Sequence, residues 1–309
     1  MTAVLVLALV AACTVQAAAM LAAASWPRRS PAAAIVLWQA LGLGWGLATV
    51  GTLIGLGTAG QPAGVAGGVL AELDLVAQGR VALSPLMAAR MVCLVAGLVL
   101  LALLVWILLA ASAAVLRARQ RQRVLLSLLA HGDPKVPGAL VVDYPTAAAY
   151  CLPGLRSAIV ISAGTLDLLD SAELAAVLAH ERAHLRERHD LVLLPFVALL
   201  NAFAWSPVAR EAHQAVALLI EMHADDMARR HRPARELATA LLRVGAAGGG
   251  LAPSGALAAV QPAMDCDVAA RVTRLLRPAP GLSVSALALV ALAATLAIMV
   301  PAGVLLMPL

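Results

Sequence analysis

The chain has 309 residues, of which 62% are hydrophobic and only 13% are charged, and its mean hydropathy is +0.92. In soluble domains roughly a quarter of the residues are charged, so this composition excludes an ordinary soluble protein. It indicates several membrane spans plus one domain of modest size. The formal charge of +5 comes mostly from arginines beside apolar runs, which we interpret as topology signals rather than a nucleic-acid surface. The four cysteines show no Cys-x-x-Cys spacing, so neither a disulfide framework nor a cysteine zinc site is indicated.

Four apolar runs are each long enough to cross the roughly 30 Å of a bilayer's hydrocarbon core. They lie at about residues 3–26, 32–60, 87–116 and 282–309. The first run is interpreted as a retained span because no basic region precedes it; a cleaved signal peptide with a processing site near Ala22 is the alternative. The second run contains small residues that allow helices to approach closely, namely Gly42, Gly44, Gly46 and Gly51.

Arginines beside these runs predict the orientation of the chain in the membrane. Arg28 and Arg29 place the first connection in the cytoplasm. The nearly neutral loop at 61–85 then lies outside, and four arginines within residues 117–123 return the chain to the cytoplasm. The pattern predicts a multi-pass protein of the plasma or inner membrane, with both termini outside.

Titratable side chains are concentrated between the third and fourth runs. All seven histidines and every acidic residue except Glu72 and Asp74 lie there. A transporter would keep some of these groups inside its spans, so transport is disfavoured. We predict a membrane domain of three spans at 1–116, a cytoplasmic domain at 117–281 and a fourth span at 282–309.

An H-E-x-x-H sequence, His180-Glu181-x-x-His184, lies in this domain within a predicted helix. Asp170 and Glu173 have the spacing of a helix N-terminus. Residues four apart differ by about 40° around a helix, so both imidazoles can bind one metal ion. Glu181 flanks the pair without being a ligand, which is the arrangement of a zinc peptidase whose glutamate is the general base.

A third ligand is predicted in the helical segment 211–231. Glu221 would give a catalytic zinc site its third protein ligand and leave a fourth position for water. Asp225, one turn on, would accept the free N–H of a ligating histidine; a surface helix with ion pairs is the alternative. His223 points about 160° away from Glu221 around the helix, and is interpreted as exposed or as an oxyanion stabiliser. Other histidines are interpreted as ordinary polar residues, namely His189, His213 and His231.

The rest of the domain carries weaker signals. Strand character is found at 139–143, 157–162 and, less clearly, 147–151. One interpretation is that an exposed strand edge binds an extended substrate. The alternative is that the strands only cover the helix that carries His180 and His184. Residues 191–205 are too short for a span and are interpreted as a membrane-associated or core helix. Arg271 and Arg274 either dock on the domain or mark the inner edge of the fourth span.

The order of these features resembles a known group of membrane peptidases. Three spans precede AIVISAGTLDLLDSAELAAVLAHERAH, then EMHAD, then RVTRLL and a fourth span. This order is similar to the BlaR/MecR-type integral-membrane zinc metallopeptidases and, more distantly, to HtpX and the CAAX prenyl endopeptidases. The resemblance implies a gluzincin-like domain that cleaves proteins, in the best-known relatives as a step of antibiotic sensing that ends in loss of a BlaI-type repressor. Those sensors carry a penicillin-binding domain after the last span, which this sequence lacks, so covalent β-lactam sensing is not expected.

The sequence therefore predicts a mainly α, four-span polytopic membrane protein with a cytoplasmic α+β zincin-like metallopeptidase domain between spans 3 and 4. We expect a Zn²⁺-dependent endopeptidase that hydrolyses proteins at the cytoplasmic face, in regulatory proteolysis such as inactivation of a BlaI-type transcriptional repressor. The alternatives are a membrane-protein quality-control protease and a non-catalytic signalling or scaffold protein with a degenerate peptidase domain. The lipid bilayer is an expected partner, whereas direct nucleic-acid binding is not expected.

Overall fold

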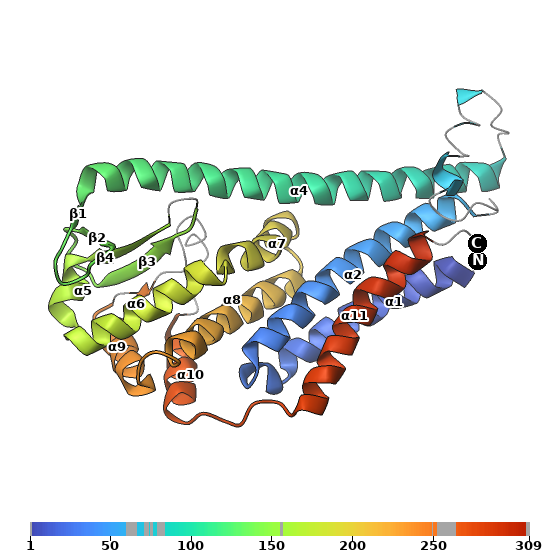
Figure 1. Cartoon of the computed structure of the whole chain (residues 1–309). Coiled ribbons are helices and arrows are strands. Elements are labelled where there is room, and N and C mark those ends of the chain that lie inside the picture. The colour runs from blue at the N-terminus through green and yellow to red at the C-terminus, as the bar shows by residue number, and fades with distance from the viewer. Residues whose placement is uncertain are drawn as a thin grey trace. The chain divides into compact units, whose positions relative to one another are not determined.

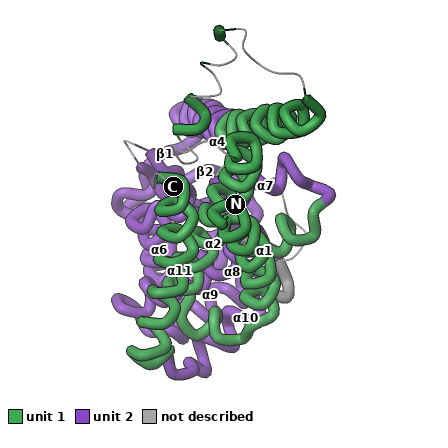
Figure 2. Tube along the Cα trace, turned by 90° about the vertical axis from the view of Figure 1, so that its right-hand side faces the viewer, with its two compact units in different colours: residues 1–107, 206–212, 282–309 green, residues 108–205, 213–281 purple. Residues whose placement is uncertain are grey.

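The computed structural model divides the chain into two compact units, which Figure 2 colours separately. It describes residues 2–59, 67–70, 74, 77–78, 84–154, 157–248, 250–251 and 264–306. Unit 1 comprises Met1–Ile107, Ser206–Ala212 and Leu282–Leu309, and unit 2 comprises Leu108–Trp205 and His213–Gly281. Most of the predicted loop at 61–85 lies outside the described residues.

Four described helices are long and apolar enough to cross a membrane. They are α1 (Thr2–Ala23), α2 (Pro31–Gly57), α4 (Pro85–Leu129) and α11 (Val284–Leu306), with a short 3-10 helix, η1 (Trp26–Arg28), between the first two (Figure 1). They fall at the four predicted apolar runs and support a multi-pass membrane protein. Helix α4 continues beyond the predicted end of its span because the arginine-rich segment that follows contains no glycine or proline.

Helix α2 packs against both α1 and α11 within unit 1, and two of its glycines allow the close approach to α11. A Cβ atom at Gly44 would overlap the backbone oxygen of Ala297, and one at Gly51 would lie 2.8 Å from a leucine side chain of α11. The predicted role of small residues is therefore confirmed at these two positions. Gly42 and Gly46 have no neighbour within 4 Å of such a Cβ atom.

Among its described residues, unit 2 contains a five-stranded sheet in the order β1-β2-β4-β3-β5. The strands are β1 (Ala130–Gly132), β2 (Ala139–Val142), β3 (Ala148–Leu152), β4 (Ala158–Ser162) and β5 (Gly250–Leu251). β2 pairs with β4 and β3 with β5 in parallel, whereas the β1–β2 and β3–β4 pairs are antiparallel. The sequence predicts β2, β3 and β4, but β1 and β5 have too few residues to show an alternating pattern.

Helices cover both faces of this sheet. The helices after β4 are α5 (Ala163–Leu168), α6 (Ser171–Arg186), α7 (His189–Ala202), α8 (Pro207–Ala228), α9 (Ala234–Ala246) and, after β5, α10 (Met264–Leu276). Successive strand residues face opposite sides, so Val141 and Ile161 join the main core with α6, α9 and α10. Val160 and Leu152 face the other way and pack against Leu126 of α4. Helix α6 therefore lies between the sheet and α9 (Figure 1).

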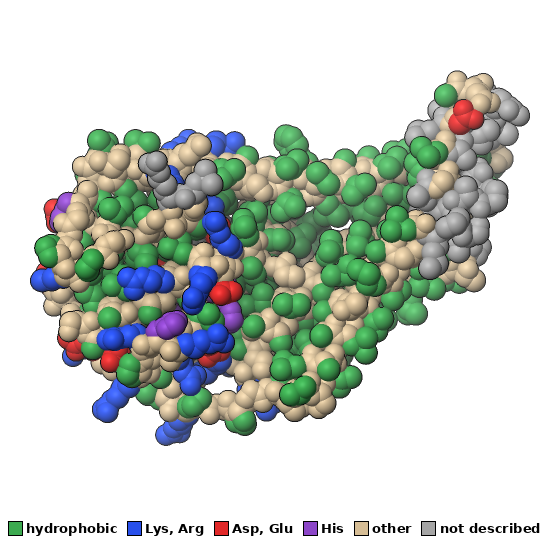
Figure 3. Space-filling model, in the orientation of Figure 1, with side chains coloured by type: hydrophobic (Ala, Val, Ile, Leu, Met, Phe, Trp, Pro, Cys, Tyr) green, Lys and Arg blue, Asp and Glu red, His purple; other side chains and the backbone are tan. Residues whose placement is uncertain are grey.

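Helix α7 accounts for the short apolar segment predicted at 191–205. It buries Leu193, Phe196 and Val197 while Leu191 is exposed, so one face of the helix belongs to the protein core. Charged and histidine side chains gather over the elements of unit 2, whereas the visible surface of the apolar helices is mostly hydrophobic (Figure 3). This division agrees with the distribution of titratable residues along the sequence.

We predict that Gly44→Ala weakens the packing of α2 against α11. The added methyl group meets backbone rather than a movable side chain, so the free energy of unfolding should fall by about 1–3 kcal/mol. Gly42→Ala is the matched control, because its methyl group enters open space and alanine favours the helix. Thermal unfolding of both purified variants in detergent tests this, and equal midpoints would contradict the proposed contact.

Candidate metal centre

Helix α6 begins with a capping box that fixes its first turn. Asp170 accepts hydrogen bonds from backbone N–H groups of that turn, and the Glu173 carboxylate accepts one from the N–H of Asp170. Arg243 of α9 lies 2.8 Å from the same Glu173 carboxylate. Because the start of the helix is fixed, its register places His180 and His184 one turn apart on the buried side.

Donor atoms of three side chains from α6 and α8 converge at this point. Nε2 of His180 lies 3.1 Å from Nε2 of His184 and 3.3 Å from Oε2 of Glu221. Nε2 of His184 lies 3.5 Å from Oε1 of Glu221. Donors bound tetrahedrally to zinc at about 2.0–2.2 Å are about 3.3–3.6 Å from each other. The observed separations of 3.1–3.5 Å, two of which end on different oxygens of Glu221, are close to these values. The three side chains therefore fit a metal ion, and they form the candidate metal-binding group found among the described residues.

Glu181 lies on α6 beside these donors and is buried, with 2% of its surface exposed. Burial raises the pKa of Glu181 to about 7, although the neighbouring His180 and a hydrogen bond from the Cys151 thiol of β3 oppose the rise. A carboxyl group that titrates near neutrality can both accept and release a proton. The chemistry of Glu181 thus suits proton transfer next to a metal site.

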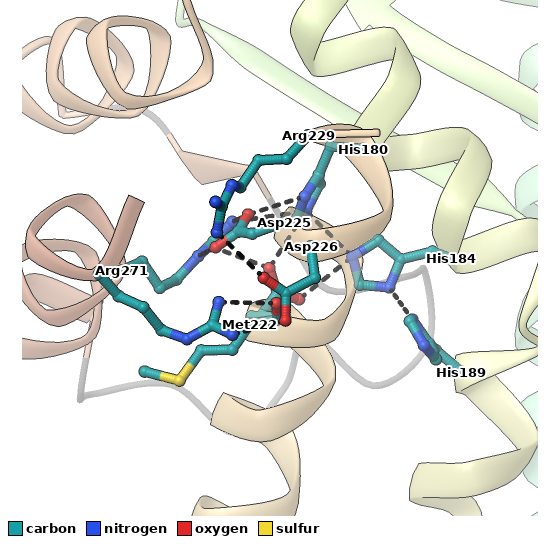
Figure 4. A network of polar contacts seen from close by, with 10 residues as sticks. His180, His184, His189, Met222, Asp225, Asp226, Arg229 and Arg271 are labelled. Atoms are coloured by element: carbon teal, nitrogen blue, oxygen red, sulfur yellow. Dashed lines mark hydrogen bonds and ion pairs between the residues drawn. The ribbon is translucent and has the colours of Figure 1, made fainter. Parts of the chain in front are cut away.

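Arg271 of α10 contacts two carboxylates of α8, those of Glu221 and Asp225. Figure 4 shows the Arg271 side chain directed toward Asp225. Its guanidinium lies 2.9 Å from Glu221 and donates two hydrogen bonds, of 2.9 and 2.7 Å, to Asp225. Burial alone would raise the pKa of both carboxyls, but Arg271 holds the pKa of Glu221 well below its usual range and lowers that of Asp225 to about 2. The sequence leaves the role of Arg271 open, and the structure shows that it docks on the domain. Arg274 docks beside it, 2.5 Å from Asp226.

Asp225 lies on the far side of the His180 ring from the convergent donors. Its Oδ1 is 3.0 Å from Nδ1 of His180, in a close ionic contact rather than a well-aligned hydrogen bond. Burial would lower the pKa of His180, but Asp225 and Glu221 outweigh it and raise the pKa to about 9. The structure therefore places Asp225 next to His180, where the sequence analysis expects a residue that orients a ligand.

His189 is a neighbour of the site that sequence reasoning missed. Its interpretation as an ordinary polar residue is wrong, because it is buried and its Nδ1 lies 2.9 Å from Nδ1 of His184 (Figure 4). Burial lowers the pKa of His189 to about 3 and that of His184 to about 4. The H-E-x-x-H spacing carries no signal for His189, because the chain must turn sharply after α6 to bring it back.

The other three histidines of this region lie outside the donor group. The His223 ring lies against that of His189, with centroids 5.5 Å apart, and it is not among the three convergent donors. His213 is buried and His231 is exposed. Glu221, rather than His223, is thus the residue of α8 that the structure brings to the two α6 histidines.

Comparison with known proteins supports the chemistry suggested by this geometry. Residues 115–240 match the model of Peptidase family M48, and this stretch includes the predicted residues of α6 and α8 but ends before α10. No curated protein and no solved structure matches the chain. The family match supports a zincin-type metallopeptidase domain.

We predict that Arg271→Met destabilises unit 2. Loss of the guanidinium leaves the buried Asp225 and the partly exposed Glu221 without their arginine partner, and breaking a buried pair typically costs about 3–5 kcal/mol. Arg232→Met is the control, because its contact with Glu236 joins side chains that are 36% and 24% exposed and should contribute about 0–1 kcal/mol. Denaturant unfolding of the two variants is the measurement; a similar small loss in both would refute the structural importance of Arg271.

Proposed function

We propose that this protein is a membrane-embedded zinc endopeptidase that hydrolyses proteins on the cytoplasmic side of a plasma or inner membrane. The observation that carries the proposal is the convergence of His180, His184 and Glu221, whose donor atoms lie 3.1–3.5 Å apart, beside the buried Glu181. The family match and the four apolar helices support the peptidase chemistry and the membrane location.

His180, His184 and Glu221 would hold the zinc ion, with Asp225 orienting the ring of His180. Bound zinc supplies a water molecule of lowered pKa and a Lewis acid for the scissile carbonyl oxygen. Glu181 takes the proton from the attacking water and delivers it to the leaving amine. The burial that brings the pKa of Glu181 to about 7 allows one carboxyl group to perform both transfers.

The substrate is proposed to bind along the outer edge of β3. This strand pairs with β4 on one side, while among the described residues β5 pairs only with Ala148 and Ala149 on the other. Cys151, two residues further along β3, donates a hydrogen bond to Glu181. An extended peptide that adds to the strand by backbone pairing would therefore pass next to the general base.

The biological role is a finer proposal, which rests on the sequence resemblance. Regulatory cleavage of a BlaI-type repressor predicts that one soluble DNA-binding protein disappears from cells that carry the active chain. Quality control predicts instead the loss of many misassembled membrane proteins. Quantitative proteomics of cells with the wild type or an inactive variant separates these outcomes, and no change in any protein would favour the non-catalytic scaffold.

We predict that Glu181→Gln abolishes most proteolysis while zinc still binds. Removal of a general base typically lowers the rate by about 10²–10⁴-fold, whereas the three proposed ligands are unchanged. The measurements are kcat/KM on a protein substrate and zinc content of the purified chain. Glu187→Gln, at an exposed position just beyond the end of α6, is the matched control, and wild-type cleavage by the Glu181 variant would rule out the proposed mechanism.

A further inference from the structure

The contact between His184 and His189 joins two buried imidazoles through their Nδ1 atoms. The atoms are 2.9 Å apart, and the rings meet edge to face with centroids 4.8 Å apart. The other nitrogen of His184, Nε2, is the atom that faces His180 and Glu221. His189 thus contacts the side of the His184 ring that is opposite to the donor group.

One of the two Nδ1 atoms must carry the hydrogen of this contact, and the ligand role of His184 decides which one. A histidine that binds a cation through Nε2 keeps its proton on Nδ1. His184 would then donate from Nδ1, and Nδ1 of His189 would accept. With a cation at Nε2, the contact stabilises the tautomer of His184 whose Nε2 lone pair points toward the other two donors.

A sharp turn after α6 places His189 where it can make this contact. Arg188 adopts the left-handed conformation, with φ 50° and ψ 43°, and it is the single described non-glycine residue with positive φ. Such a conformation costs about 1–3 kcal/mol and persists only where the surrounding structure imposes it. The turn ends α6 and starts α7 at His189, so that the chain folds back over His184.

Asp190, the residue after His189 in α7, is held by an ion pair. The Asp190 carboxylate is buried and lies 2.7 Å from the guanidinium of Arg119 on α4. Asp190 Oδ1 and His189 Nε2 are both buried without a hydrogen-bond partner among the described residues. The Arg119–Asp190 ion pair holds the first turn of α7, which begins at His189.

We infer that His189 is a positioning residue that fixes the ring orientation and tautomer of His184, and that the Arg119–Asp190 ion pair holds His189 in place. The inference rests on the proposed function, in that His184 is taken as a metal ligand. His189 itself neither binds the metal nor contacts the substrate, and it acts through His184.

The test compares two amide substitutions in the full chain, purified in detergent. The side-chain oxygen of Asn occupies the place of Nδ1 in histidine, whereas the terminal group of Gln occupies the place of Nε2. His189→Asn should therefore keep the contact with His184 and bind Zn²⁺ within about threefold of wild type. His189→Gln should lose about 10–100-fold in Zn²⁺ affinity, the usual effect of removing a residue that orients a metal ligand. Affinity is measured by competition with a chromophoric chelator, so no proteolysis is needed.

Further variants test the Arg119–Asp190 ion pair and the geometry of the metal ligands. Arg119→Met should weaken Zn²⁺ binding in the same direction as His189→Gln, while Arg117→Met, exposed on the same helix, should not. His231→Gln makes the same chemical change at an exposed position and should bind as wild type. With Co²⁺ as the probe, the visible absorption of His189→Gln should shift from the wild-type spectrum, and that of His189→Asn should not.

Each result bears on the inference. Equal Zn²⁺ affinity and equal Co²⁺ spectra for His189→Gln and wild type would overturn the positioning role and leave the proposed peptidase intact. Equal losses in the Asn and Gln variants would show that only the imidazole's packing matters, and would overturn it as well. Failure of the wild-type chain to bind Zn²⁺ would overturn both the inference and the proposed function.

Discussion

The site depends on the net charge of closely packed side chains, of which Asp225 and Arg271 are buried and Glu221 is partly exposed. Glu221 and Asp225 lie together on α8, and the single guanidinium of Arg271 contacts both of them. One positive charge for two carboxylates leaves the pair net negative, and the same field raises the pKa of His180 to about 9. Surroundings that attract a proton also favour a divalent cation. The electrostatics and the spacing of the donors therefore both indicate a bound metal ion.

The scaffold explains how such a group is kept in place. Helix α6 packs against the sheet and against α9, and its first turn is fixed by the Asp170–Glu173 capping box. Small side chains bring α8 close to α6, since Ala183 and Ala224 pack with Met227 in a cluster of their own. The donors therefore sit on helices whose register and separation are determined by core packing rather than by loops, which favours a preorganised site.

Local spacing made part of the site predictable from sequence. The four-residue repeat of a helix predicts that His180 and His184 share one face, and that Glu221 and Asp225 share another. The longer strands are predicted by their alternating pattern. Arg271 could not be assigned, because its contacts join residues that are 46 and 50 positions apart in the chain. His189 could not be found either, since the left-handed turn at Arg188 occurs at a residue type that gives no signal for it.

The division of the site among several helices has a consequence for folding. α6 and α8 supply the three donors, α10 supplies Arg271, and the start of α7 supplies His189, so the whole arrangement exists only when these helices are packed. A ligand that binds only the packed form stabilises it in proportion to the logarithm of its concentration over its Kd. A bound metal would therefore stabilise the packing of helices that are distant in sequence. The cost of the left-handed turn at Arg188 would then be offset by metal binding as well as by the apolar core.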